Sequence, residues 1–182
     1  MVLFVLCVKG ELEGVGSMVL RNDAELCISV KNPLSDYEVR ERVTLRLGEH
    51  VEQEDENSRE PPCHFALKWD GAKKRSTLTV LTEAEAKAAT KKKSGKGKIA
   101  VNMPRELNSD DSGEWVPVLA LECRGLEPYA FHPVSDEFLI TSQGGVKFQE
   151  GVDLSEGDWG DYDAENDSAV SISDFQSKFI TA

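Results

Sequence analysis

Hydrophobic residues in this chain fall into short runs separated by polar stretches, and several runs alternate with a period of two. Strand patterns cover residues 2–8, 24–30, 40–47, 76–81, 98–103 and 115–123. A last alternating stretch, A-V-S-I-S-D-F, begins at Ala169 and follows a polar segment from Asp158 that we expect to form a loop. Short runs of this kind, bounded by turn residues, are typical of β-strands. The pattern therefore predicts an all-β protein.

Two stretches differ from this pattern. Residues 82–93 read T-E-A-E-A-K-A-A-T-K-K-K, with Thr82 as the helix N-cap, Glu85 as its capping-box partner and lysines near the C-terminal end. We therefore expect one short inserted helix followed by a lysine-rich loop, together covering residues 82–98. Residues 49–62 are strongly acidic and end in two prolines, which predicts an exposed loop.

The length and composition fit one folded domain. The chain has 182 residues, of which 40% are hydrophobic and 30% charged, values that are typical of globular proteins. We expect a single β-rich domain over residues 1–182, or two packed β-sandwich or barrel-like units at about 1–109 and 114–182.

The charge and the cysteine spacing limit the function classes. A formal net charge of −12 argues against a main role in binding nucleic acid, because phosphate binding needs a basic surface. No apolar run is long enough to span a bilayer, so we expect no membrane contact. The four cysteines are far apart and form no C-x-x-C, which favours reduced thiols in a cytoplasmic protein, with the nucleus as a second location. A monomer is the simplest expectation.

The segment 122–133 reads E-C-R-G-L-E-P-Y-A-F-H-P and is unusually rich in conformationally restricted residues. It is followed by D-L at 153–154, D-W at 158–159, D-Y-D at 161–163, V-x-I at 170–172 and Phe179. Together these residues resemble the eukaryotic CXXC-motif-containing zinc-binding protein family, closely from about residue 118 onward and more loosely over 5–81. The resemblance implies two packed β units and a zinc ion held by two C-x-x-C turns in the N-terminal half, whose four thiolates make a tetrahedral site.

This chain departs from the family at both turns. The first should follow the strand at 26–30, where the sequence reads V-K-N-P, and the second should fall near W-D-G-A at 69–72. Zinc is thus expected from the family, but its ligands are absent, and we predict no cofactor. Asn32-Pro33 and Asp70-Gly71 are good turn formers and are predicted to close the two hairpins without a metal.

A relocated metal site is the alternative, because thiolate and imidazole both bind zinc. Its candidates are Cys27, Cys63, His64 and Cys123. We favour a structural interpretation, in which Cys27 is a buried strand cysteine and Cys63 and His64 are loop residues. Cys123 lies beside Arg124, which favours a reactive thiol, but it also alternates onto a strand face with two leucines, and we expect it to be buried.

The family motif itself predicts a structural corner. Arg124 and Glu127 are expected to bond to neighbouring backbone, Gly125 to supply an unusual backbone angle, and Pro128 to end the strand. The predicted structural residues are Glu122, Cys123, Arg124, Gly125, Leu126, Glu127, Pro128, Trp159, Asp161, Tyr162 and Asp163.

The C-terminal acidic cluster has two readings. Its carboxylates are suitable calcium ligands, but they lack the order of an EF-hand loop. We expect Trp159 and Tyr162 to bury their rings while the acids stay in water.

The lysine run is the one strongly basic feature of an acidic chain. It comprises Lys91, Lys92, Lys93, Lys96 and Lys98. A nuclear-import signal and a nucleic-acid contact are alternatives to the exposed insertion that we favour.

No catalytic motif surrounds His50, His64 or His132, so we expect no enzyme; a hydrolase using the C-terminal acids is the catalytic alternative. The leading hypothesis is a metal-free β-scaffold that binds a protein partner. The alternatives are metal handling through other ligands and an accessory role with nucleic acid through the lysine run.

Overall fold

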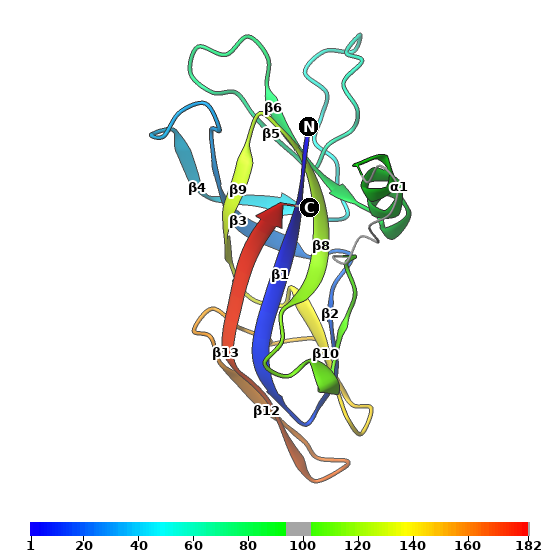
Figure 1. Ribbon diagram of the computed structural model, residues 1–182. Helices are drawn as coiled ribbons and strands as arrows, with labels where there is room; N and C mark the ends of the chain where they lie inside the picture. Colours follow the sequence, from blue (N-terminus) through cyan, green and yellow to red (C-terminus); the bar gives the residue numbers. More distant parts are fainter. Residues whose placement is uncertain (94–102, 182) are drawn as a thin grey trace.

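The computed structural model shows three antiparallel β-sheets and one α-helix, and it describes residues 1–93 and 103–181 (Figure 1). The six-stranded sheet has the order β12 (Trp159–Asp163), β13 (Ser168–Thr181), β1 (Val2–Glu13), β8 (Val116–Arg124), β6 (Ser76–Leu81) and β5 (Phe65–Leu67). The four-stranded sheet has the order β11 (Lys147–Phe148), β10 (Phe138–Ser142), β2 (Val15–Leu20) and β7 (Leu107–Asn108). The three-stranded sheet has the order β4 (Val39–Arg46), β3 (Glu25–Lys31) and β9 (Glu127–His132). The all-β prediction is confirmed.

Strand β1 is the centre of the fold because its continuous hydrophobic run is buried on both faces. It pairs with β13 on one side and β8 on the other, as Figure 1 shows. Leu6 and Val8 have no exposed surface, and they belong to a core that also contains Phe138 and Ile140 of the four-stranded sheet. A continuous apolar run is expected for a strand that is covered on both faces.

Strands from both halves of the chain mix in every sheet. The six-stranded sheet joins β1, β5 and β6 to β8, β12 and β13, and the three-stranded sheet joins β3 and β4 to β9. One hydrophobic cluster runs through all three sheets. The suggested division at about 109–114 therefore does not separate two sheets or two cores.

The single helix forms as its local sequence predicts. Helix α1 spans Glu83–Lys93. The Thr82 amide donates to Glu85 Oε2 at 2.8 Å, and the Glu85 amide donates to Thr82 Oγ1 at 3.3 Å, which completes the capping box. The segment 49–62 has no regular secondary structure and is mostly exposed. No helix in the described ranges has the length and apolar character needed to cross a membrane.

The structure corrects the sequence predictions at several strands. The segment expected as a loop from Asp158 contains β12, which pairs with the last strand as a hairpin. Strands β2, β5, β7, β9, β10 and β11 were not expected from the pattern. The predicted strand at 98–103 lies outside the described residues except for Met103, which is not in a strand.

Candidate functional site

The first hairpin turn, between β3 and β4, is closed by hydrogen bonds within residues 32–38. The Asn32 amide donates to the Glu38 carbonyl at 2.9 Å, and the Ser35 amide donates to the Asn32 carbonyl at 3.2 Å. Asn32 Oδ1 also accepts from the Leu34 amide at 3.0 Å. An asparagine that caps the backbone two residues later forms a stable local turn. Here a side-chain amide orders the loop.

The second hairpin turn, between β5 and β6, has a tight turn at residues 69–72. The Ala72 amide donates to the Trp69 carbonyl at 3.0 Å, and Gly71 has a φ of +76°. A positive φ at the third position of such a turn favours glycine. The sequence W-D-G-A therefore closes this turn with backbone hydrogen bonding.

Trp69 joins these hairpins to each other and to the 122–128 motif. Its indole is 5% exposed, and its Nε1–H donates to the Gly125 carbonyl at 2.8 Å. The guanidinium carbon of Arg40, on β4, lies 5.3 Å from the ring centroid, within the range of a cation–π contact. The side chain of Trp69 thus joins the second hairpin, to which it belongs, to the first hairpin and to the turn after β8.

The 122–128 motif turns the chain from one sheet into another. Strand β8 belongs to the six-stranded sheet and β9 to the three-stranded sheet. Gly125 between them has a φ of +74°, and a Cβ atom there would lie 2.5 Å from Ser76 Oγ. Leu126 is buried beside this glycine. The backbone angle therefore favours glycine, and a larger residue would also force the Ser76 side chain to shift.

The charged residues of this motif bond to side chains, which differs from the expected backbone contacts. Arg124 Nη2 and Nε contact Glu122 Oε1 at 2.8 and 3.0 Å, and Glu127 contacts Lys31 Nζ at 3.5 Å. Pro128 does not end the strand: it lies inside β9, opposite Val30 at a bulge. A proline is tolerated there because the bulge interrupts the hydrogen-bond ladder.

The four cysteines are buried at separate places and none forms a disulfide. Cys7 lies on β1, Cys27 on β3, Cys63 just before β5, and Cys123 on β8. Burial raises the pKa of each thiol, that of Cys123 to about 12, where Glu122 and Glu127 add to the effect. These thiols are therefore protonated at neutral pH and are not reactive thiolates.

His64 is held by backbone groups. Its Nδ1 accepts the Val80 amide at 2.9 Å, and its ring lies 4.5 Å from that of His50. Burial lowers the pKa of His64, and the His50 charge lowers it further. The lone pair of Nδ1 is engaged by the Val80 amide, so this nitrogen is not available to a metal.

The comparisons with known proteins agree on one family. The family model described as "CXXC motif containing zinc binding protein, eukaryotic" matches residues 5–180. The chain belongs to this family. Sequence relatives include the UPF0587 protein CG4646 of Drosophila melanogaster, 44% identical over 72 residues, which are 40% of this chain and 44% of that protein. The CXXC motif containing zinc binding protein of Homo sapiens is 32% identical over 76 residues, 42% of this chain and 47% of that protein. The chain thus spans about half the length of the curated relatives it matches.

Solved structures share the fold over nearly the whole chain. A hypothetical protein from Plasmodium falciparum has a TM-score of 0.77 and 23% identity, and it covers 99% of this chain and 100% of its own. The structure titled "Crystal Structure of C1orf123" has a TM-score of 0.75 and 20% identity, with 99% of each chain covered.

The zinc ion in the family's name does not fit the residues of this member. Neither hairpin turn carries a cysteine, and no group of three or more His, Cys, Asp or Glu side chains within residues 1–93 and 103–181 is placed to hold a metal. The candidates for a relocated metal site, Cys27, Cys63, His64 and Cys123, are not brought together as such a group. All four cysteines and all three histidines lie within those ranges.

One of the C-terminal acids, Asp163, forms hydrogen bonds that stabilise the β12–β13 hairpin. Asp163 is fully buried and accepts hydrogen bonds from Ser142 Oγ at 2.7 Å and Asn166 Nδ2 at 2.8 Å. The Ser142 hydroxyl is the main reason that the pKa of Asp163 is lowered. The expectation that the acids stay in water is therefore wrong for Asp163. Trp159 is buried as expected, but Tyr162 is 51% exposed, since it lies on the face of β12 opposite to the buried Trp159 and Asp163.

The lysine run lies partly in α1. Lys91, Lys92 and Lys93 form its last turn, and Lys91 is exposed. Lys96 and Lys98 fall outside the described residues.

Sequence reasoning did not single out Trp69 or the exposed pair Leu34 and Tyr37. The turn sequence W-D-G was visible, but the acceptor of its indole lies 56 residues away, at Gly125. No local sequence pattern predicts such a long-range contact. An isolated leucine and tyrosine within the polar N-P-L-S-D-Y turn did give a signal, since apolar side chains in a tight turn have nowhere to be buried.

Proposed function

We propose that this member of the family contains no zinc and serves as a non-enzymatic scaffold that binds a protein partner through the tip of its first hairpin. The tip comprises Leu34, Tyr37 and Val39. Support for the metal-free state comes from the two turns, which are closed by their own hydrogen bonds, and from Trp69, which joins them. The buried, unpaired cysteines also suit a reducing, cytosolic location.

The observation that carries the proposal is the exposure of the tip. Leu34 is 94% and Tyr37 92% exposed, and Val39 follows with 39%. Three exposed hydrophobic side chains within six residues are more than the scattered single ones that any surface carries. The Asn32 hydrogen bonds hold the loop in one conformation, which reduces the entropy that binding must overcome. A tyrosine is a frequent anchor at protein interfaces.

A comparative pull-down tests this function. The tagged protein, a Leu34→Ser/Tyr37→Ser variant and a Tyr162→Ser control are incubated with cell extract, and captured proteins are identified by mass spectrometry. Tyr162 is the matched control because it is a half-exposed tyrosine on the β12–β13 hairpin, at the other end of the molecule (Figure 1).

We expect a partner that the parent and the control capture and the tip variant does not. With that partner purified, the tip variant should bind at least about tenfold more weakly, the effect of losing a modest hot spot. Equal capture by the tip variant and the control would refute the proposed surface.

A further inference from the structure

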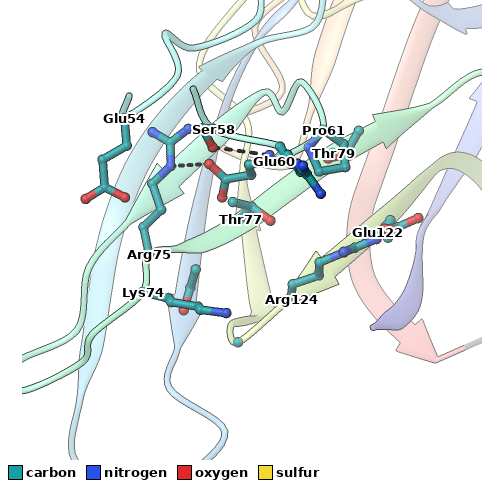
Figure 2. A pocket seen from close by; sticks show the side chains of 13 residues that line it. Glu54, Ser58, Glu60, Pro61, Lys74, Arg75, Thr77, Thr79, Glu122 and Arg124 are labelled. Carbon is teal, nitrogen blue, oxygen red and sulfur yellow. Dashed lines mark hydrogen bonds and ion pairs between the residues drawn. The ribbon is translucent and has the colours of Figure 1, made fainter. Parts of the chain in front are cut away.

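A groove lies beside the 122–128 motif, and the family resemblance assigns it no role. Its volume is about 640 Å³. Its floor is the outward face of β6 and β8, where Thr77 pairs with Arg124 and Thr79 with Glu122. One wall is the 49–62 loop, and another is the end of the β5–β6 turn at Lys74 and Arg75. Figure 2 shows Lys74 and Arg75 on one side of Thr77 and Arg124 on the other.

The side chains that line the groove carry a small net positive charge, whereas the whole chain is strongly negative. The groove is lined by four cationic side chains and three carboxylates, on a chain whose net charge is −12. The carboxylates are engaged: Glu60 by Arg75 at 2.7 Å, Glu122 by Arg124 at 2.8 Å, and Glu54 by Lys68 at 3.8 Å. The other two lining cations are Arg59 and Lys74, and no carboxylate of residues 1–93 and 103–181 pairs with either of them.

Hydroxyl groups line the groove between these charges. Thr77 and Thr79 lie on the same outward face of β6, and neither hydroxyl forms a hydrogen bond to any other residue that the structure describes. Both hydroxyls are therefore available to a molecule in the groove. Arg124 has one guanidinium nitrogen, Nη1, free of the Glu122 contact.

The ligand that suits this set of groups is a phosphomonoester. Guanidinium and ammonium groups with neighbouring hydroxyls are the usual donors to phosphate oxygens. The volume lies in the range of small-molecule sites. Among the described residues, no aromatic side chain lines the groove, so it lacks the ring on which nucleobases most often stack.

We propose that this groove binds a phosphomonoester group, with Lys74, Arg59 and Arg124 as the cationic contacts and the hydroxyls of Thr77 and Thr79 as hydrogen-bond donors. The group can belong to a phosphorylated metabolite without a base or to a phosphorylated serine of a protein. The site is independent of the hairpin tip, since it uses none of Leu34, Tyr37 and Val39.

Titration followed by amide NMR shifts tests the site on the full chain. The probes are inorganic phosphate, glucose 6-phosphate and a short peptide with one phosphoserine, each against its unphosphorylated counterpart or against chloride. We expect saturable shifts at Thr77 and Thr79 with at least one phosphorylated probe, weakening as salt is added. Tighter binding of the peptide would assign the source to a protein, and tighter binding of the sugar phosphate to a metabolite.

Two variants separate the groove from general charge effects. Lys74→Ala should weaken binding at least about tenfold, the effect of one lost charged contact. Lys73→Ala removes the same charge from an exposed neighbour that does not line the groove, and it should bind like the parent. A Thr79→Val variant should also bind more weakly while keeping the strand.

The proposal is overturned if no phosphorylated probe gives saturable shifts, or if Lys73→Ala and Lys74→Ala weaken binding equally. Thermal melts of all three variants establish that they are folded before binding is measured.

Discussion

The Trp69 side chain contacts two other parts of the chain, at Arg40 and Gly125, so its removal tests whether these contacts hold the hairpins together. Trp69→Ala should lower the free energy of unfolding by about 3–5 kcal/mol, the usual cost of deleting a large buried aromatic side chain. Trp69→Phe keeps most of the ring but leaves the Gly125 carbonyl without its donor, which should cost about 1–3 kcal/mol. Urea unfolding followed by circular dichroism gives both values.

Trp115→Ala is the matched control for these variants. Trp115 is only half-buried, and the ammonium groups of Lys9 and Lys178 lie 5.8 and 4.2 Å from its ring centroid. Its loss should cost less than that of Trp69. A Trp69→Ala protein as stable as Trp115→Ala would show that the hairpins do not depend on this side chain.

His64 makes stability depend on pH in a defined direction. Burial lowers the pKa of His64 in the folded state, whereas the unfolded side chain takes up a proton near pH 6.5. Below that pH the unfolded state binds more protons, so the free energy of unfolding falls on acidification, by at most about 1.4 kcal/mol per pH unit for one group.

A His64→Gln variant checks this dependence. Its urea midpoint should change less between pH 7 and pH 5 than that of the parent. The remaining change reports other groups, including His132, whose pKa burial also lowers. Identical pH profiles for parent and variant would exclude His64 as a source.

The β8–β9 corner is the element in which backbone angle and packing act together. Gly125→Ala meets both a positive φ and the Ser76 hydroxyl at 2.5 Å, whereas Gly71→Ala meets the same φ region with nothing within 4 Å. We expect about 1–2 kcal/mol for Gly71→Ala, from backbone strain alone, and a clearly larger loss for Gly125→Ala.

Thermal or urea unfolding of the two glycine variants separates these contributions. The difference between them measures how closely β6 must approach the corner. Equal losses would mean that the close approach costs nothing and that only the φ value matters.

Across the whole molecule, the parts that could be predicted from sequence are those with local signals. The strand patterns of β1, β3, β6 and β8 are long and apolar, and α1 carries its own capping box. The sequence of β12, W-G-D-Y-D, predicts a loop because glycine and aspartate are typical turn residues. Its strand conformation comes from pairing with β13, which is a tertiary effect.

The candidate sites depend even more on distant contacts. The sequence locates both turns that lack C-x-x-C, but the Trp69 side chain finds its acceptor at Gly125, and the groove brings Arg59, Lys74 and Arg124 together from three segments. Such sites require the sheet order, which the alternation of polar and apolar residues does not determine.

The central claim is that hydrogen-bonded turns and Trp69 hold this scaffold where the family's name implies zinc. The most direct test measures the zinc content of the protein, purified without chelators, together with its urea unfolding midpoint before and after treatment with 1,10-phenanthroline. We predict zinc at the buffer background and an unchanged midpoint. One zinc ion per chain, with a midpoint that falls on chelation, would contradict the account.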